Sequence, residues 1–150
     1  MKTKNFEFKI FTKESIAALT NVRPGEVKIG ECVKVGFDTT SKYVLIGVCE
    51  DIGPQANFGN PGANRTFSVA LTRFLNMQSN RRYSGESIAC AGFVQQLTPF
   101  NSIDEARVLV SELDDLLIDL LVPIYQNNQI PILIGGGHNN AYALIAAFHK

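Results

Sequence analysis

Residues 130–140, IPILIGGGHNN, form the stretch that decides the fold. Its first five residues are apolar and suit a β-strand, and three glycines follow them directly. A glycine run lets the backbone turn sharply and come close to a ligand. A helix is expected from about Asn140 onward. The stretch therefore predicts a strand, a tight turn that carries His138, and a helix. This places His138 at the carboxyl end of a strand, where open α/β sheets bind ligands.

Further strands and helices are expected on the N-terminal side of this unit. Strands are predicted at residues 43–49 and 87–94, with a weaker edge strand at 27–37, and helices at 12–20, at 67–75, and from a cap at Asn101 or Ser102 to about Ile124. The run at 43–49 is apolar throughout, as in a parallel strand that is buried on both faces. Pro123 is expected to kink the long helix or to mark its last turn. Strands that alternate with helices imply a parallel sheet with right-handed crossovers and helices on both faces.

The composition excludes several classes of partner. The 150 residues include 14 basic and 14 acidic side chains, so no net field attracts nucleic acid or an acidic membrane surface. The longest apolar run, residues 141–148, is too short to span a bilayer. Near the N-terminus, Glu7 and Lys9 interrupt the apolar run that a signal peptide requires. Three cysteines without a C-x-x-C pair argue against a disulfide framework or a zinc knuckle. A cytoplasmic protein with reduced thiols is expected.

His138 and the glycines before it each have two interpretations. Imidazole is the commonest metal ligand among side chains, but a lone histidine in this place also serves structural roles. A phosphate cradle is the other use of a glycine run. This run has neither the G-x-x-x-x-G-K-[S/T] nor the G-x-G-x-x-G pattern, and no lysine to meet a phosphate. The residues alone leave both roles of His138 open and make a flavodoxin-like or nucleotide-binding domain the weakest interpretation.

Several segments together resemble the ureohydrolase superfamily, which includes arginase, agmatinase and formimidoylglutamase. The segments that carry the resemblance are 23–26, 47–59, 61–64, 75–80 and 131–142. Residues 47–59, GVCEDIGPQANFG, are most similar to the formimidoylglutamase-like branch, whose pattern there is G-x-P-E-D-I-G-x-x-A-N-x-G. Cys49 stands where that pattern prefers proline. The likeness runs over nearly all of the chain and indicates the N-terminal half of such a protein.

The resemblance implies a three-layer α/β/α sandwich with a parallel sheet, the arginase-like fold in incomplete form. Residues 1–150 would be a single α/β domain, with 1–40 as an N-terminal extension. Members of the family hold two Mn²⁺ ions at the carboxyl ends of the strands, and His138 takes the place of the first-motif histidine ligand. The other ligands come from later D-A-H-x-D and D-x-D motifs, which do not occur in residues 1–150. Further metal ligands and the catalytic residues are therefore expected beyond Lys150, and the chain alone is expected to be inactive.

The implied reaction is hydrolysis of a linear C–N bond in a small guanidino or formimino substrate. For the formimidoylglutamase branch it converts N-formimidoyl-L-glutamate to glutamate and formamide in histidine breakdown, whereas arginine or agmatine would release urea. Asn57 and Arg65, in the long loop at 50–65, are candidates to meet a substrate carboxylate. Asn57 is also a typical turn residue. Homo-oligomers are expected, as is common in the family. The alternative is a non-catalytic assembly or binding module that keeps the fold without the metal site.

Two other expectations concern surfaces. The acidic pair Asp114-Asp115 is expected on a solvated helix face. The helix at 141–148 is apolar all the way round and should be buried on most sides. It is therefore expected either to form an interface or, preferably, to be covered by elements beyond Lys150. The sheet is expected to end in an uncovered edge strand, which would make the chain self-associate.

Overall fold

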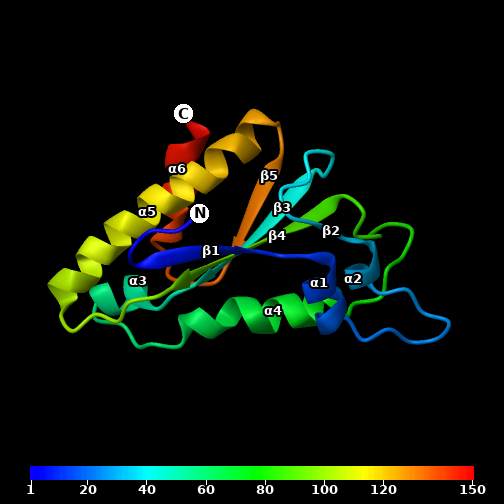
Figure 1. Ribbon diagram of the computed structural model, residues 1–150, viewed down its shortest axis with the longest axis horizontal. Helices are drawn as coiled ribbons and strands as arrows, with labels where there is room; N and C mark the ends of the chain where they lie inside the picture. The colour runs from blue at the N-terminus through cyan, green and yellow to red at the C-terminus, as the bar shows by residue number, and fades with distance from the viewer.

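A single mixed sheet forms the centre of the protein, as described by a computed structural model of residues 1–150 (Figure 1). Its strands are β1 (Phe6–Ile10), β2 (Lys34–Val35), β3 (Tyr43–Cys49), β4 (Ile88–Gln96) and β5 (Ile130–Ile134). The order across the sheet is β1-β4-β3-β5, and β2 pairs with the beginning of β4. The strands β2, β3, β4 and β5 run parallel, while β1 is antiparallel to β4. The carboxyl ends of β3, β4 and β5 therefore lie together at one end of the strands.

Helices cover both faces of the sheet, which makes three layers (Figure 1). One face carries α3 (Ile52–Ala56), α5 (Ile103–Gln126) and α6 (Asn140–Phe148). The other face carries α1 (Lys13–Leu19), α2 (Ile29–Cys32) and α4 (Thr66–Leu75). The short 3-10 helix η1 (Ala63–Arg65) directly precedes α4. The larger core lies under α5, where Leu113, Leu117 and Leu121 are fully buried. The smaller core surrounds Phe67 of α4. The predicted α/β/α sandwich is confirmed.

The central elements agree with the sequence predictions. The strand β3 has a buried interior, and α4 buries Phe67, Leu71 and Leu75 along one face, as the helical spacing predicted. Ser102 caps α5 by accepting a hydrogen bond from the backbone N–H of Glu105 at 3.1 Å. Pro123 lies within the last turns of α5, which continues to Gln126. These elements followed from local patterns, and tertiary packing did not alter them.

Two predictions for the N-terminal region were wrong or incomplete. Residues 27–37 are not one edge strand, because α2 and the two-residue strand β2 occupy them. The reason lies at Gly30, where a Cβ would stand 2.1 Å from Thr20 Oγ1, so the glycine lets α2 pack against the end of α1. The strand β1 was not predicted at all. Its alternation of buried Phe6 and Phe8 with outward-facing Glu7 was a readable strand signal. Both β1 and β2, within residues 1–40, belong to the sheet.

One edge of the sheet is open along β5, which pairs only with β3. The backbone N–H of Ile130 donates to Lys42 O at 2.9 Å, so the alternate residue Pro131 faces the open edge. Proline has no N–H to offer there, which makes the edge a poorer template for another strand. Ile132 beside it is 37% exposed. Self-association through this edge stays a prediction.

The helix α6 is covered on one side only. Only Asn140, Ala143 and Ala147 are buried, through packing against α5. Tyr142 and Ile145 are 61% and 62% exposed, so the outer side of this helix is uncovered, and its burial by an interface or by further elements stays a prediction. No helix of the protein combines the length and the apolar character that crossing a membrane requires.

Candidate functional site

The glycine turn after β5 brings His138 to the carboxyl edge of the sheet. Gly135 and Gly136 have φ angles of +97° and +69°, in the left-handed region that favours glycine. A Cβ on Gly135 would lie 2.8 Å from the carbonyl oxygen of Val48 on the neighbouring strand. The turn is therefore held close against the end of β3. The side chain of His138 is exposed, immediately before α6.

The residues present do not form a complete metal site. No group of three or more histidine, cysteine, aspartate or glutamate side chains is arranged to hold a metal ion. His138 stands alone, and the nearby acidic side chains are engaged elsewhere: Glu50 accepts from two backbone N–H groups, and so does Asp51. One imidazole does not fit the two-manganese centre that the resemblance implies. No catalytic step through a metal follows from this chain alone.

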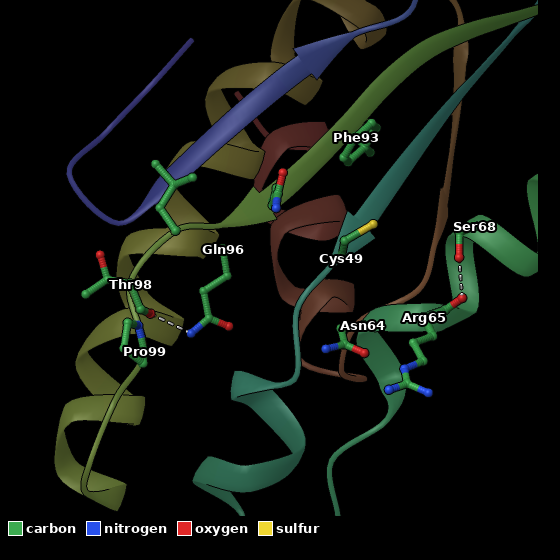
Figure 2. A pocket seen from close by; sticks show the side chains of 10 residues that line it. Cys49, Asn64, Arg65, Ser68, Phe93, Gln96, Thr98 and Pro99 are labelled. Atoms are coloured by element: carbon green, nitrogen blue, oxygen red, sulfur yellow. Dashed lines mark hydrogen bonds between the residues drawn. The ribbon is translucent and has the colours of Figure 1, made fainter. Parts of the chain in front are cut away.

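A polar cavity of about 560 Å³ lies at the same edge, beyond the ends of β3 and β4 (Figure 2). Its lining residues are Cys49, Asn64, Arg65, Ser68, Phe93, Gln95, Gln96, Leu97, Thr98 and Pro99. Arg65 belongs to η1 and is exposed, and none of the ion pairs of the protein involves it. A guanidinium without an acidic partner is free to bind a carboxylate through two parallel hydrogen bonds.

The two candidate substrate residues are placed differently by the structure. Arg65 lines the cavity, whereas Asn57 is not among its lining residues. Asn57 is exposed at the end of α3, where its backbone N–H donates to Pro54 O at 3.2 Å, which is a turn role. Asn64, which was not singled out as a binding residue, does line the cavity. Asp51 holds Asn64 in place by accepting a hydrogen bond from its backbone N–H at 2.8 Å.

Cys49 is the one thiol in the cavity, and its chemistry argues against a nucleophilic role. Burial raises the pKa of the Cys49 thiol above its ordinary value. The thiolate is the reactive form of cysteine, and burial disfavours it at Cys49. Cys90, inside β4, is buried and has its pKa raised to about 12 by the same cause. All three cysteines are free thiols, as expected.

The structure corrects the expectation for the acidic pair on α5. Asp115 is exposed, but Asp114 is half-buried and its Oδ1 has no hydrogen-bond partner. Burial, with repulsion from Asp115 and Glu50, raises the pKa of Asp114 to about 6. The physical reason is packing, because α5 lies against α3 and α6, and Asp114 is close enough to Glu50 for the two charges to repel each other.

We expect Asp114→Asn to stabilise the protein at about pH 8 but not at about pH 4. Between about pH 4, where aspartate titrates in an unfolded chain, and about 6, the folded state keeps a proton that the unfolded state has released. Stability therefore falls as the pH rises through this window. The gain above it is about 1 kcal/mol once solvent screening of a half-buried group is counted. Urea unfolding at both pH values measures it.

The matched control for this prediction is Asp119→Asn, on an exposed position of the same helix. It should change stability equally little at both pH values. A gain from Asp114→Asn that is the same at pH 4 and pH 8 would contradict the assignment of the raised pKa to this residue.

Comparison with known proteins agrees with the fold. Searches against protein-family models and against curated protein sequences give no match. The fold nevertheless resembles that of a solved structure. This is the crystal structure of Trypanosoma cruzi formiminoglutamase with Mn²⁺, at 21% sequence identity and a TM-score of 0.54. The likeness covers 82% of this chain and 41% of that one, so the chain spans about two fifths of that protein. An identity this low carries the fold and not the activity.

Proposed function

We propose that this chain is one portion of a hydrolase that cleaves a linear C–N bond of an amidine or guanidine. N-formimidoyl-L-glutamate is the favoured substrate, which water converts to glutamate and formamide. The observation that carries the proposal is the position of His138, on a glycine turn at the carboxyl end of β5 in a ureohydrolase-like fold. Arginine and agmatine are the other substrates of the same chemical class.

His138 is proposed to supply one imidazole ligand of a manganese centre that other residues complete. The exposed imidazole of His138 can bind a metal, but residues 1–150 do not complete a group of three ligands around it. Mixed imidazole and carboxylate ligands suit manganese. The remaining ligands would come from sequence outside residues 1–150, in the same polypeptide or in a partner. When bound, such metals lower the pKa of a bound water and make it a nucleophile.

Arg65 is proposed to bind a carboxylate of the substrate in the polar cavity. Formimidoylglutamate has two carboxylates and a polar amidine end, which matches a cavity that combines one free guanidinium with amide and hydroxyl side chains. Asn64 and Ser68 stand beside Arg65 on the same wall (Figure 2). The cavity would thus hold the substrate by its carboxylate, and His138 would be one of the residues that hold the metal.

The test uses the longest open reading frame that contains residues 1–150. Its product, supplied with Mn²⁺, should release formamide from N-formimidoyl-L-glutamate. His138→Ala should reduce the rate by about a hundredfold or more, because loss of a residue that only supports a metal ligand already costs about ten- to a hundredfold. The 150-residue chain alone should show no hydrolysis above its own His138→Ala control. Hydrolysis by the short chain would contradict the need for further ligands, and a reading frame that stops after Lys150 would contradict completion by the same polypeptide.

The same product tests the cavity. We expect Arg65→Ala to raise the KM for formimidoylglutamate about tenfold with little change in kcat, because a charge-assisted bond to the substrate is lost. Asn57→Ala is the matched control, since Asn57 lies outside the cavity, and its KM should equal that of the unaltered enzyme. Equal KM values for all three proteins would remove Arg65 from the binding site.

The alternative is a non-catalytic assembly or binding module. The exposed apolar side chains of α6 and the open edge of β5 favour it, because each is a feature that a partner could cover. Under this alternative the complete product binds formimidoylglutamate weakly or not at all and hydrolyses none of the three substrates. A stop codon directly after Lys150 would also support it.

A further inference from the structure

Glu50 is the most deeply buried charged side chain of the protein, at 1% exposure. It directly follows β3, and its carboxylate bridges two loops. Oε2 accepts a hydrogen bond from the backbone N–H of Gly53, at 2.9 Å, in its own loop. Oε1 accepts one from the backbone N–H of Gly137, at 2.5 Å, 87 residues further along the chain. One carboxylate therefore joins the loop after β3 to the turn after β5.

No cation neutralises this carboxylate. None of the ion pairs of the protein includes Glu50, and the charged neighbour on the helix above it is Asp114, whose own pKa Glu50 helps to raise. Burying a carboxylate without a counter-ion is costly. Hydrogen bonds from N–H groups to an ionised oxygen are strong enough to offset much of that cost. Glu50 is thus stabilised only in a geometry that presents both N–H groups to it.

The glycines of the turn are what allow the carboxylate to approach. A Cβ on Gly136 would stand 2.4 Å from Glu50 Oε1 and 2.6 Å from Asn140 Nδ2. Asn140 holds the other side of the turn, because its Nδ2 donates to the carbonyl oxygen of Gly135 at 3.3 Å. Gly137, whose N–H is bound by Glu50, immediately precedes His138. The orientation of the peptide at Gly137 therefore determines the position of the His138 Cα and the direction in which its side chain leaves the backbone.

We propose that Glu50 is a positioning residue that fixes the turn at 135–137 and so the direction in which His138 is presented. The importance of His138 rests on the proposed function, but the connection between Glu50 and the turn does not. Glu50 acts through the backbone and is not proposed to contact a substrate or a metal.

The first test uses the unaltered chain, labelled with ¹⁵N and ¹³C. A scalar coupling across the hydrogen bond should link the amide nitrogen of Gly137 to the side-chain carboxyl carbon of Glu50. A second coupling should link that carbon to the amide nitrogen of Gly53. Absence of the Gly137 coupling under conditions where the Gly53 coupling is seen would overturn the proposal, and no variant needs to fold for this result.

The second test compares Glu50→Gln with a matched control, Asp51→Asn. Asp51 is also buried and its Oδ1 also accepts two backbone N–H bonds, from Gly62 and Asn64, but both lie in its own loop. We expect Glu50→Gln to speed hydrogen exchange at the Gly137 amide by about tenfold or more, as loss of a buried charge-assisted bond implies. Asp51→Asn should speed exchange at Asn64 and leave Gly137 unchanged.

The imidazole resonances of His138 separate positioning from general stability. They should shift in Glu50→Gln and stay in place in Asp51→Asn. Faster exchange at Gly137 with unshifted His138 resonances would overturn the positioning role and leave a merely structural contact. These measurements involve no metal and no substrate, so they stand or fall separately from the hydrolase activity.

Discussion

Phe67→Ala should lower the free energy of unfolding by about 3–5 kcal/mol, the range for removing a buried phenylalanine. Phe67 is 2% exposed and forms the centre of the smaller core. Its ring centroid lies 6.2 Å from that of Phe11 and 6.2 Å from that of Phe93, so three aromatic rings pack together. A Cβ on Gly47 of β3 would stand 2.1 Å from the Phe67 ring, which shows how closely α4 lies on the sheet.

The size of this effect comes from the cavity left behind. The ring fills the space between α4 and β3, and a Cβ on Gly135 would lie 3.3 Å from the Phe67 Cβ, so the glycine turn rests on the same residue. Denaturant unfolding measures the loss. Val69→Ala is the control on the same helix, because Val69 is 56% exposed and its truncation should change stability by less than about 0.5 kcal/mol. Similar losses for the two variants would contradict a core centred on Phe67.

Gly92→Ala should destabilise the protein by about 3 kcal/mol, at the upper end of the range for overpacking. A Cβ at this position of β4 would stand 2.1 Å from the backbone carbonyl oxygen of Lys9 and 2.8 Å from the Phe8 ring. The contact is with backbone, so no side chain can rotate away to relieve it. The register of β3 against β4 also shifts next to this residue, between Leu45 and Ile46. We expect the pairing of β1 with β4 to weaken first.

Denaturant unfolding together with hydrogen exchange along β1 tests this prediction. Gly25→Ala is the control for a positive-φ glycine with space around it, because Gly25 has a φ of +81° and no atom within 4 Å of a Cβ, whereas Gly92 has a φ of +156° and is crowded. That control should cost only about 1 kcal/mol, the usual penalty for a left-handed residue other than glycine. If Gly92→Ala is no more destabilising than Gly25→Ala, close approach of β1 does not explain the glycine.

The elements that the sequence predicted well are those whose pattern is local. The strand β3 is a continuous apolar run, α4 has apolar residues at helical spacing, and α5 begins with a capping serine, Ser102. Each of these signals involves residues within a few positions of one another. The alternating apolar residues at 27–37 indicated an edge strand, but that strand does not form. The true structure of this segment depends on the fit of Gly30 against Thr20, which no local pattern reveals.

In the candidate site, too, some residues could be predicted from local sequence and others could not. His138 was predicted from its glycine run, and Arg65 from its place in a loop rich in glycine, proline and asparagine, and both assignments stay predictions. Asn57 matched the same composition but lies outside the cavity. The burial of Asp114 was missed because the faces of α5 turned toward α3 and α6 depend on how the helices pack.

The sequence by itself determined the layers of this fold, the strand and turn that carry His138, and the ureohydrolase-like resemblance. Those features follow from the period of apolar residues and from glycine conformations, which are properties of short segments. Only the tertiary structure decided that β1 joins the sheet, that Arg65 and not Asn57 lines the cavity, and that Glu50 holds the turn of His138. A carboxylate and an amide 87 residues apart meet because parallel strands bring their carboxyl ends together, and that contact exists only once the sheet has formed.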